Sequence, residues 1–358
     1  MRACLIALGL FGFAPVAWAE ESVRIAVETE AAQVQLKAAS LSFAEDDDDP
    51  QYVPLGADEV RLTVVRGAVA GLPGSTSVES VRLRGAGSSV TVNGLELRGE
   101  VVVSPGRRGL NVVNVVSLEN YLVGVIGSEM PKSFPTEALK AQAVAARTFA
   151  LHKKLLAMGQ SVHLGSSVLS QVYKGLAVED ERTREAVRAT EGLVVTHQLQ
   201  PIEAYFHASC GGRTASGLEA LGRNLPYLRP VHCPCEKLPQ SRWSLTLDAS
   251  ELASAVGGRT TALSVMGRTP TGRARRVQVS TERSVDAVTF RERVGYTKLK
   301  SLLFDVTRAR GGWEVTGRGY GHGAGLCQWG AKALADAGRS YSEILAHYYP
   351  GTELQKLY

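Results

Sequence analysis

The chain has 358 residues, of which 44% are hydrophobic and 21% charged, and its formal net charge at pH 7 is +5. This is an ordinary globular composition, and the length predicts two domains, or one domain with a large accessory part. The basic residues are dispersed, apart from residues 272–276, and no aromatic residues alternate with them. These features argue against nucleic acid as a partner.

The first 19 residues have the pattern of a secretory signal peptide. Arg2 supplies the positive start, an apolar run of about a dozen residues follows, and residues 17–19 form an A-x-A cleavage site. The run is too short to span a bilayer comfortably, and no later stretch is long and apolar enough to do so. We therefore expect cleavage near Ala19 and an exported mature protein that begins near Glu20 and has no transmembrane segment.

Residues 20–114 predict a β-rich N-terminal region. Short runs of Val, Leu and Ile are interrupted there by Gly, Pro and Ser, which is typical of strands joined by turns. The acidic run over residues 44–51 lacks the regular Asp, Asn and Gly spacing of a calcium-binding loop, so we interpret it as a solvated loop.

The apolar residues take up the period of a helix from residue 117 onwards. Ser117 is placed to cap a first helix that Pro131 ends, and a second helix begins near Ser133 and runs to about Met158. Together they predict a helix hairpin with Glu129 at its corner. Apolar neighbours would raise the pKa of this carboxyl group towards the range of a general acid. The alternative is a solvated glutamate in a turn.

Short helices and strands are mixed beyond residue 185, and a glycine-rich loop over residues 319–331 leads into a last helix. Because helices and strands do not alternate regularly, the sequence predicts an α+β fold, in which the helix hairpin carries the site beside mixed β-sheets. The glycines would display His322 and Gln328 from a rigid loop. This loop lacks the Lys-Ser/Thr ending of a nucleotide-binding loop, and a purely structural glycine loop is the alternative.

One histidine and three cysteines have the spacing of a structural zinc site. His207, Cys210, Cys233 and Cys235 would give one imidazole and three thiolates, and His232 could replace His207 as a ligand. The alternative is a disulfide from Cys210 to Cys233 or Cys235, which an oxidising compartment favours. The spacing favours the metal, because a Cys-x-Cys pair does not easily bridge itself.

Several ordered motifs together resemble the SpoIID/LytB family of bacterial cell-wall proteins. They are GSEMPKSFPTEALKAQAVAARTFAL (127–151), SQVYKG (170–175), PIEAYFHASCGGRTA (201–215), FRERVGYTKLKS (290–301) and GRGYGHGAGLCQWGA (317–331). The resemblance covers residues 115–358 and implies a catalytic domain of this family there. The strands before it are similar to the variable β-rich leader that such proteins carry.

The resemblance implies cleavage of peptidoglycan glycan strands by a lytic transglycosylase. The sporulation member of the family acts on strands already stripped of their stem peptides, so the resemblance implies such a substrate here, 1,6-anhydro-N-acetylmuramic acid ends as products and no catalytic cofactor. Its catalytic acid, the glutamate of the GEMP motif, falls on Glu129 in SEMP. Its other motif positions, which we interpret as substrate-binding, fall on Arg147, Gln171, Tyr173, His322 and Gln328.

Other positions of the family pattern concern structure. Zinc-binding members place ligands around the segment that corresponds to FHASCGG, which fits His207, Cys210, Cys233 and Cys235. Arg147 lies on the order of 18 Å along its helix from the corner, at 1.5 Å per residue, so we expect no contact with Glu129 and keep a structural role as the alternative. Serines stand where the family often has an aspartate before QVY, and Cys327 replaces a small polar residue. We expect Cys327 to be a free thiol near the site.

A second branch of the family implies a different class of protein. Its members are amidase enhancers, which would bind the wall and assist a separate amidase without cleaving glycan. In that reading Glu129 would only hydrogen-bond a sugar, whereas the retained SEMP glutamate favours the enzyme. Both readings imply peptidoglycan as a partner and a location in the periplasm or cell wall.

Overall fold

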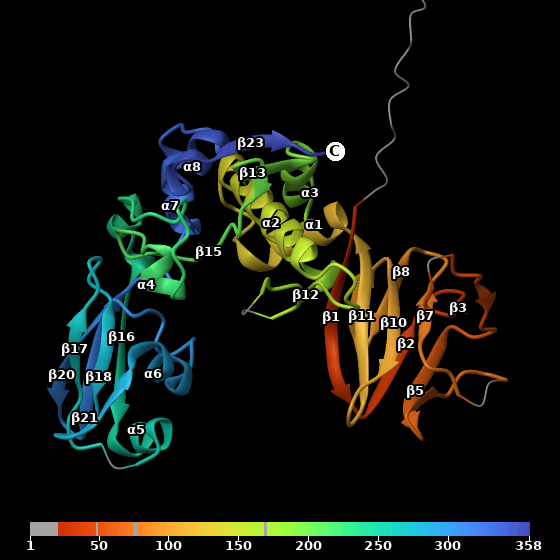
Figure 1. The fold of residues 1–358 in the computed structure, drawn as a ribbon, viewed down its shortest axis with the longest axis horizontal. Helices are drawn as coiled ribbons and strands as arrows, with labels where there is room; N and C mark the ends of the chain where they lie inside the picture. Colours follow the sequence, from red (N-terminus) through yellow and green to blue (C-terminus); the bar gives the residue numbers. More distant parts are fainter. Residues whose placement is uncertain (1–20, 48, 75–76, 168–169, 259) are drawn as a thin grey trace, which may run out of the picture.

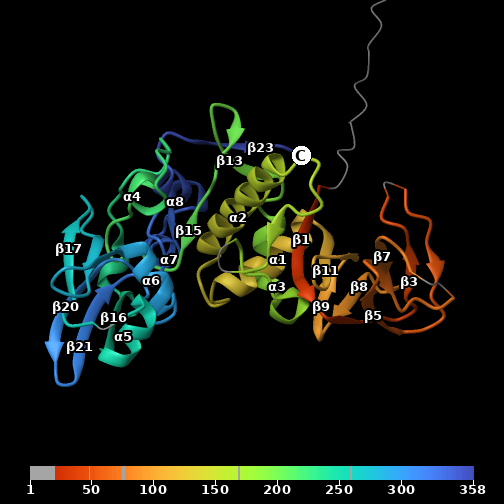
Figure 2. The same ribbon diagram turned by 60° about the horizontal axis from the view of Figure 1, so that its bottom comes forward.

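The computed structural model describes residues 21–47, 49–74, 77–167, 170–258 and 260–358. The predicted signal peptide lies outside these residues. Helices and several β-sheets are mixed along the chain, which confirms the predicted α+β class. Figures 1 and 2 show three parts, with the N-terminal sheets and a later group of strands and helices on opposite sides of a helical centre.

Two β-sheets form the N-terminal part. Their strands are β1 (Ser22–Ala31), β2 (Gln33–Lys37), β3 (Ser42–Ala44), β4 (Val53–Pro54), β5 (Glu59–Val65), β6 (Ala68–Ala70), β7 (Val81–Arg84), β8 (Ser89–Val92), β9 (Leu95–Arg98), β10 (Glu100–Pro105), β11 (Leu110–Ser117) and β12 (Leu164–Gly165). One sheet has the order β12-β1-β11-β10-β7-β3-β4, and the other has the order β6-β5-β2-β8-β9. Alternate residues of these strands, such as Val34 and Leu36, are buried in the larger of two hydrophobic cores.

Strand β11 joins these sheets to the helices. It pairs antiparallel with β1 and β10, and it continues directly into helix α1 (Leu118–Glu129). Ser117 caps α1 as predicted, since its hydroxyl oxygen accepts the Asn120 N–H at 3.4 Å. The predicted division between residues 114 and 115 falls inside β11.

Helix α2 (Thr136–Leu156) lies at the centre of the molecule, where its small alanine side chains let neighbouring helices pack closely. It forms the predicted hairpin with α1. Its N-cap is Pro135 rather than the expected Ser133, and its last residue is Leu156. The other elements here are η1 (Gly175–Val178), α3 (Glu181–Arg188), β13 (Leu193–His197), β14 (Gln200–Pro201), β15 (Phe206–His207), α4 (Gly217–Leu221), η2 (Pro234–Lys237), η3 (Pro239–Ser241), β22 (Leu326–Cys327), α7 (Gln328–Asp336), α8 (Tyr341–Tyr348) and β23 (Glu353–Lys356).

A smaller lobe over residues 242–318 has a hydrophobic core of its own. Its elements are β16 (Arg242–Asp248), α5 (Ala249–Val256), β17 (Ser264–Arg268), β18 (Ala274–Gln278), β19 (Ser284–Asp286), α6 (Ala287–Val294), β20 (Phe304–Ala309) and β21 (Gly312–Arg318). They form two three-stranded sheets, β16-β21-β20 and β17-β18-β19. This lobe was not predicted as separate from the rest of residues 115–358.

Candidate active site and cysteine cluster

Glu129 is the last residue of α1, and its side chain is half-buried. The helix ends there because Met130 has an extended backbone and Pro131 cannot continue the helix. The carboxylate oxygen Oε1 accepts a hydrogen bond from the Val172 N–H at 2.8 Å. Burial raises the pKa of Glu129, although this bond and one from the Gln328 side chain act in the opposite direction. A carboxyl group that keeps its proton to higher pH is suited to protonate a leaving oxygen.

Three segments that are distant in the sequence meet at this carboxyl group: the end of α1, the loop before η1 and the start of α7. Gln328 is the first residue of α7, and its Nε2 donates to Oε1 of Gln142 at 3.4 Å. Both glutamines are almost completely buried. Gln142 was not among the predicted site residues, although a lone glutamine among the alanines of a helix was a signal that could have pointed to it.

The loop that carries Val172 is held in place by the residues on either side of Val172, which are Gln171 and Tyr173. Gln171 is fully buried, where its Oε1 accepts the Tyr121 hydroxyl at 2.9 Å and its Nε2 donates to the Ala146 carbonyl at 3.1 Å. The ring of Tyr173 packs on that of Tyr121, with centroids 4.9 Å apart. The two predicted residues therefore fix the loop so that its backbone N–H faces Glu129. The sequence could not identify Val172, because the group it contributes is backbone.

Arg147 lies inside the helical centre, with no exposed surface. Its Nε and Nη2 donate to the two carboxylate oxygens of Glu119 at 2.7 and 2.6 Å, and further donors reach the carbonyls of Val187 and Leu193. These contacts tie α1, α2 and α3 together. Of the two roles that we expected for Arg147, this geometry supports the structural one.

His322 connects the glycine-rich loop to β15 through a hydrogen bond. Its Nδ1 accepts the Ala324 N–H at 3.1 Å, so its Nε2, which lies 2.9 Å from the Phe206 carbonyl oxygen, carries the proton. Burial lowers the pKa of His322 to about 4, so the ring is neutral at pH 7. Both ring nitrogens are thus engaged by backbone, and the side chain shapes the loop that leads to Gln328.

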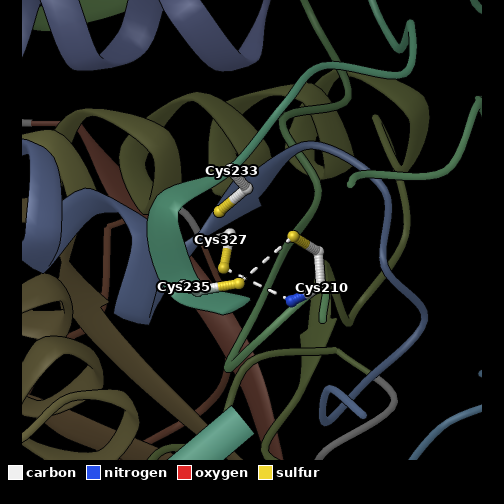
Figure 3. Close-up of side chains that lie close together, drawn as sticks. All are labelled: Cys210, Cys233, Cys235 and Cys327. Atoms are coloured by element: carbon white, nitrogen blue, oxygen red, sulfur yellow. Dashed lines mark hydrogen bonds between the residues drawn. The ribbon is translucent and has the colours of Figure 1, made fainter. Parts of the chain in front are cut away.

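Four cysteines form a buried cluster, shown in Figure 3. The sulfur atoms of Cys210, Cys233, Cys235 and Cys327 all lie within 4.8 Å of one another, and the thiols are free. Cys210 follows β15, Cys233 and Cys235 belong to the η2 segment, and Cys327 ends β22 directly before Gln328. Three of the four predicted ligands are therefore together, with Cys327 as the fourth member.

His207, which we expected as a ligand, lies outside this cluster. Its Nδ1 is 3.1 Å from the Ala324 carbonyl oxygen, and its ring packs against that of His322 at 5.2 Å. Its Nε2 is buried and has no partner among the described residues. In the structure Cys327 from the glycine-rich loop, rather than His207, completes the cluster, and the pairing of β15 with β22 sets Cys327 opposite His207.

The cluster brings four sulfur atoms together in the protein interior. Hydrogen bonds from Cys210, Cys233 and Cys327 lower the pKa of Cys235, which favours its thiolate form. Burial and the neighbouring thiols raise the pKa of Cys327 instead. Four buried sulfurs at this spacing fit a tetrahedral Zn²⁺ site, in which bonds of about 2.3 Å would place the sulfurs about 3.8 Å apart. Cys210 and Cys235 have a sulfur–sulfur distance of 3.5 Å.

Comparison with known proteins places the chain in a family. The family described as Stage II sporulation protein (SpoIID) matches residues 106–197, and a domain of unknown function matches residues 236–325. Stage II sporulation protein D of Bacillus subtilis is 32% identical over 301 residues, which cover 78% of this chain and 87% of that protein. The chain belongs to the SpoIID family.

Two further relatives show how widely the similarity extends. Stage II sporulation protein D of Bacillus amyloliquefaciens is 32% identical over 264 residues, which cover 68% of this chain and 76% of that protein. The amidase enhancer of Bacillus subtilis is 32% identical over 290 residues, which cover 65% of this chain but only 40% of that protein.

Among the described residues, no helix is both long enough and apolar enough to cross a membrane.

Proposed function

We propose that this chain acts at the bacterial cell wall as a lytic transglycosylase that cleaves the glycan strands of peptidoglycan. The proposal rests mainly on the half-buried carboxyl group of Glu129, which lies where three of the sequence motifs meet. Burial raises the pKa of this group. Membership of the SpoIID family supports the assignment to the cell wall. The substrate in this proposal is a strand already stripped of its stem peptides.

A single carboxyl group is sufficient for this reaction. Protonated Glu129 gives its proton to the glycosidic oxygen as the bond from that oxygen to C1 of N-acetylmuramic acid breaks. The resulting carboxylate then takes the proton from the 6-hydroxyl of the same sugar, whose oxygen bonds to C1. The products are a shortened strand and a 1,6-anhydro end. Ordinary glycosidases need a second carboxylate because water or the enzyme supplies the nucleophile, whereas here the substrate does.

The surrounding residues have separate tasks in this mechanism. The Val172 N–H and the Gln328 amide hold the carboxyl group in position. Gln171 and Tyr173 pack against Tyr121 and so hold the loop that provides the Val172 N–H. His322 shapes the loop before Gln328. Substrate binding by these residues is therefore mostly indirect.

We also propose that the four cysteines hold a structural Zn²⁺ ion. Their burial and their spacing support a metal that is held by four thiolate ligands in structural sites. The ion would crosslink three segments and hold the end of β22, and thus Gln328, against α2. It would take no part in the reaction, for which we propose no catalytic cofactor.

The similarity to the amidase enhancer supports a second candidate function. In that case the same residues would hold a glycan strand without cleaving it, and an amidase would be a partner. In either case we propose an exported protein of the periplasm or cell wall. It would have a signal peptide over residues 1–19, a β-rich region over 20–114 and the functional domain over 115–358.

A digestion experiment separates the two candidates. Mature protein and its Glu129→Gln variant are incubated with glycan strands that carry or lack stem peptides, and the products are identified by mass spectrometry. Anhydro-ended fragments from peptide-free strands, formed by the unchanged protein alone, are the expected result. Cleavage at the full rate by Glu129→Gln would remove Glu129 from the mechanism. Strands that are bound but remain intact in every reaction would favour the enhancer.

A further inference from the structure

The smaller lobe carries a pocket on the exposed face of the β16-β21-β20 sheet, with a volume of about 530 Å³. Side chains that point to this face come from every second residue of each strand, so they can be read from the strand register. Ser244 lies opposite Thr316, and Thr316 lies opposite Asp305 on the next strand. The polar residues that line the pocket are Arg242, Ser244, Arg268, Asp305, Thr316 and Arg318.

Two arginines of this pocket face each other without a counter-charge. Arg242 on β16 pairs directly with Arg318 on β21, and both are exposed. Like charges directly opposite each other in an antiparallel pair destabilise a sheet. None of the ion pairs between described residues involves either side chain. The arrangement is therefore unfavourable in the free protein, and an anion bound between the two guanidinium groups would remove the repulsion.

The other charged groups of the pocket already have partners. Arg268 reaches from β17 to the carboxylate of Asp305 at 2.6 Å and to the Phe304 carbonyl at 3.0 Å. This pair closes one side of the pocket and leaves Arg242 and Arg318 as its uncompensated charge. Ser244 and Thr316 lie two residues along their strands from Arg242 and Arg318, and their hydroxyl groups can donate to or accept from the hydroxyl groups of a sugar.

We propose that this pocket binds a carboxylate group carried by a peptidoglycan strand. Two guanidinium groups bind a carboxylate with charge-assisted hydrogen bonds, while neighbouring hydroxyl groups suit a sugar ring. Arg318 is also the last residue of β21, and the glycine-rich loop that follows it leads to Gln328 at the start of α7, so the chain connects one wall of the pocket directly with one part of the candidate active site. The inference rests on the proposed function, because it takes the ligand to be wall glycan.

The carboxylate has two sources in this polymer. A strand without stem peptides exposes the lactyl carboxylate of each N-acetylmuramic acid. A strand with stem peptides has that group in an amide bond, but it carries carboxylates on the peptide. The pocket chemistry is the same for both, and the two kinds of strand therefore form separate arms of the test.

Binding is measured in the Glu129→Gln background, so that no strand is cut. The probes are peptide-free strands, strands with stem peptides, and neutral oligomers of N-acetylglucosamine. The matched control is Arg310→Gln, which removes an equal charge from the turn at the other end of β21, a strand about 20 Å long at roughly 3.3 Å per residue. The double variant Arg242→Lys and Arg318→Lys keeps the positive charge of the pocket. Melting temperatures report whether each variant is folded.

We expect Arg242→Gln combined with Arg318→Gln to weaken binding of at least one kind of carboxylate-bearing strand about tenfold, an effect that high salt should remove. The arm in which the loss occurs identifies the source of the carboxylate. The Arg310→Gln control and the neutral oligomer should show no loss. Unchanged binding of both strands, or an equal loss for the neutral oligomer, would overturn the proposal. Because no cleavage is measured, a failure of Glu129 as the acid would leave this result interpretable.

Discussion

At the scale of single residues, the burial of Glu129 is a source of both function and instability. A carboxylate without a cation beside it is more stable in water than in a half-buried position, and this is why its pKa is raised. The folded state therefore binds the proton more tightly than the unfolded chain. The free energy of unfolding that this tighter proton binding contributes is fully present below the ordinary glutamate pKa near 4.5. It is lost as pH rises through the pKa that Glu129 has in the folded protein.

We predict that Glu129→Gln is more stable than the unchanged protein at pH 7 and that the difference shrinks towards pH 4. Glutamine keeps the shape of the protonated acid and carries no charge that must be buried. The measurement is the free energy of unfolding in urea at several pH values. Cleavage by the unchanged protein should also fall as pH rises through the folded pKa, since the acid must begin protonated. A variant that is less stable than the unchanged protein at pH 7 would contradict this account.

The sequence was sufficient to find Glu129 but not its environment. A helix end followed by Met-Pro marks the corner, because local backbone chemistry determines where a helix stops. The partners of the carboxyl group come from Val172 and Gln328, which are distant along the chain, and only the folded structure brings them near. Arg147 shows the same limit, since its ion pair with Glu119 joins two helices whose packing has no signature in either helix alone.

At the scale of elements, the β22–α7 segment connects the cysteine cluster with the candidate acid. Cys327 and Gln328 are adjacent in the sequence. Cys327 contributes its sulfur to the cysteine cluster, and Gln328 contributes its amide to the site of Glu129. The helix is packed so closely there that a Cβ at Gly330 would lie 2.3 Å from the sulfur of Cys233. The cysteine spacing alone predicted three members of the cluster, whereas the fourth depended on the pairing of β15 with β22.

We predict that the purified protein holds about one equivalent of zinc and that Cys327→Ser loses it, with a fall in melting temperature of several degrees. The physical reason is that loss of one thiolate ligand lowers the affinity of the site, and metal binding stabilises the folded state. Zinc content is measured by elemental analysis, and a chelator should reproduce the shift in the unchanged protein. A count of two free thiols in the unfolded, metal-free and unreduced protein would instead indicate a disulfide.

At the scale of the whole molecule, the N-terminal sheets and the helical centre share one hydrophobic core, whereas the lobe over residues 242–318 has its own. The change of periodicity at residue 117 marks the start of α1 correctly. The preceding strand β11 lies between β1 and β10 in a sheet, so the predicted division between residues 114 and 115 passes through that sheet. Periodicity reports local structure, and the sharing of a core depends on contacts between distant segments.

This shared core gives a prediction about the N-terminal region. A fragment over residues 115–358 should be largely insoluble or unfolded, because it divides β11 and removes β1, whose Val23 and Ile25 are fully buried. Several buried aliphatic side chains would lose their contacts, each worth about 1.5–3 kcal/mol, against a total stability of about 5–15 kcal/mol for a typical domain. The measurements are soluble yield and a cooperative melting transition, with the mature chain from Glu20 as the control. A soluble fragment with a sharp transition and retained glycan binding would show instead that residues 20–114 are an independent domain.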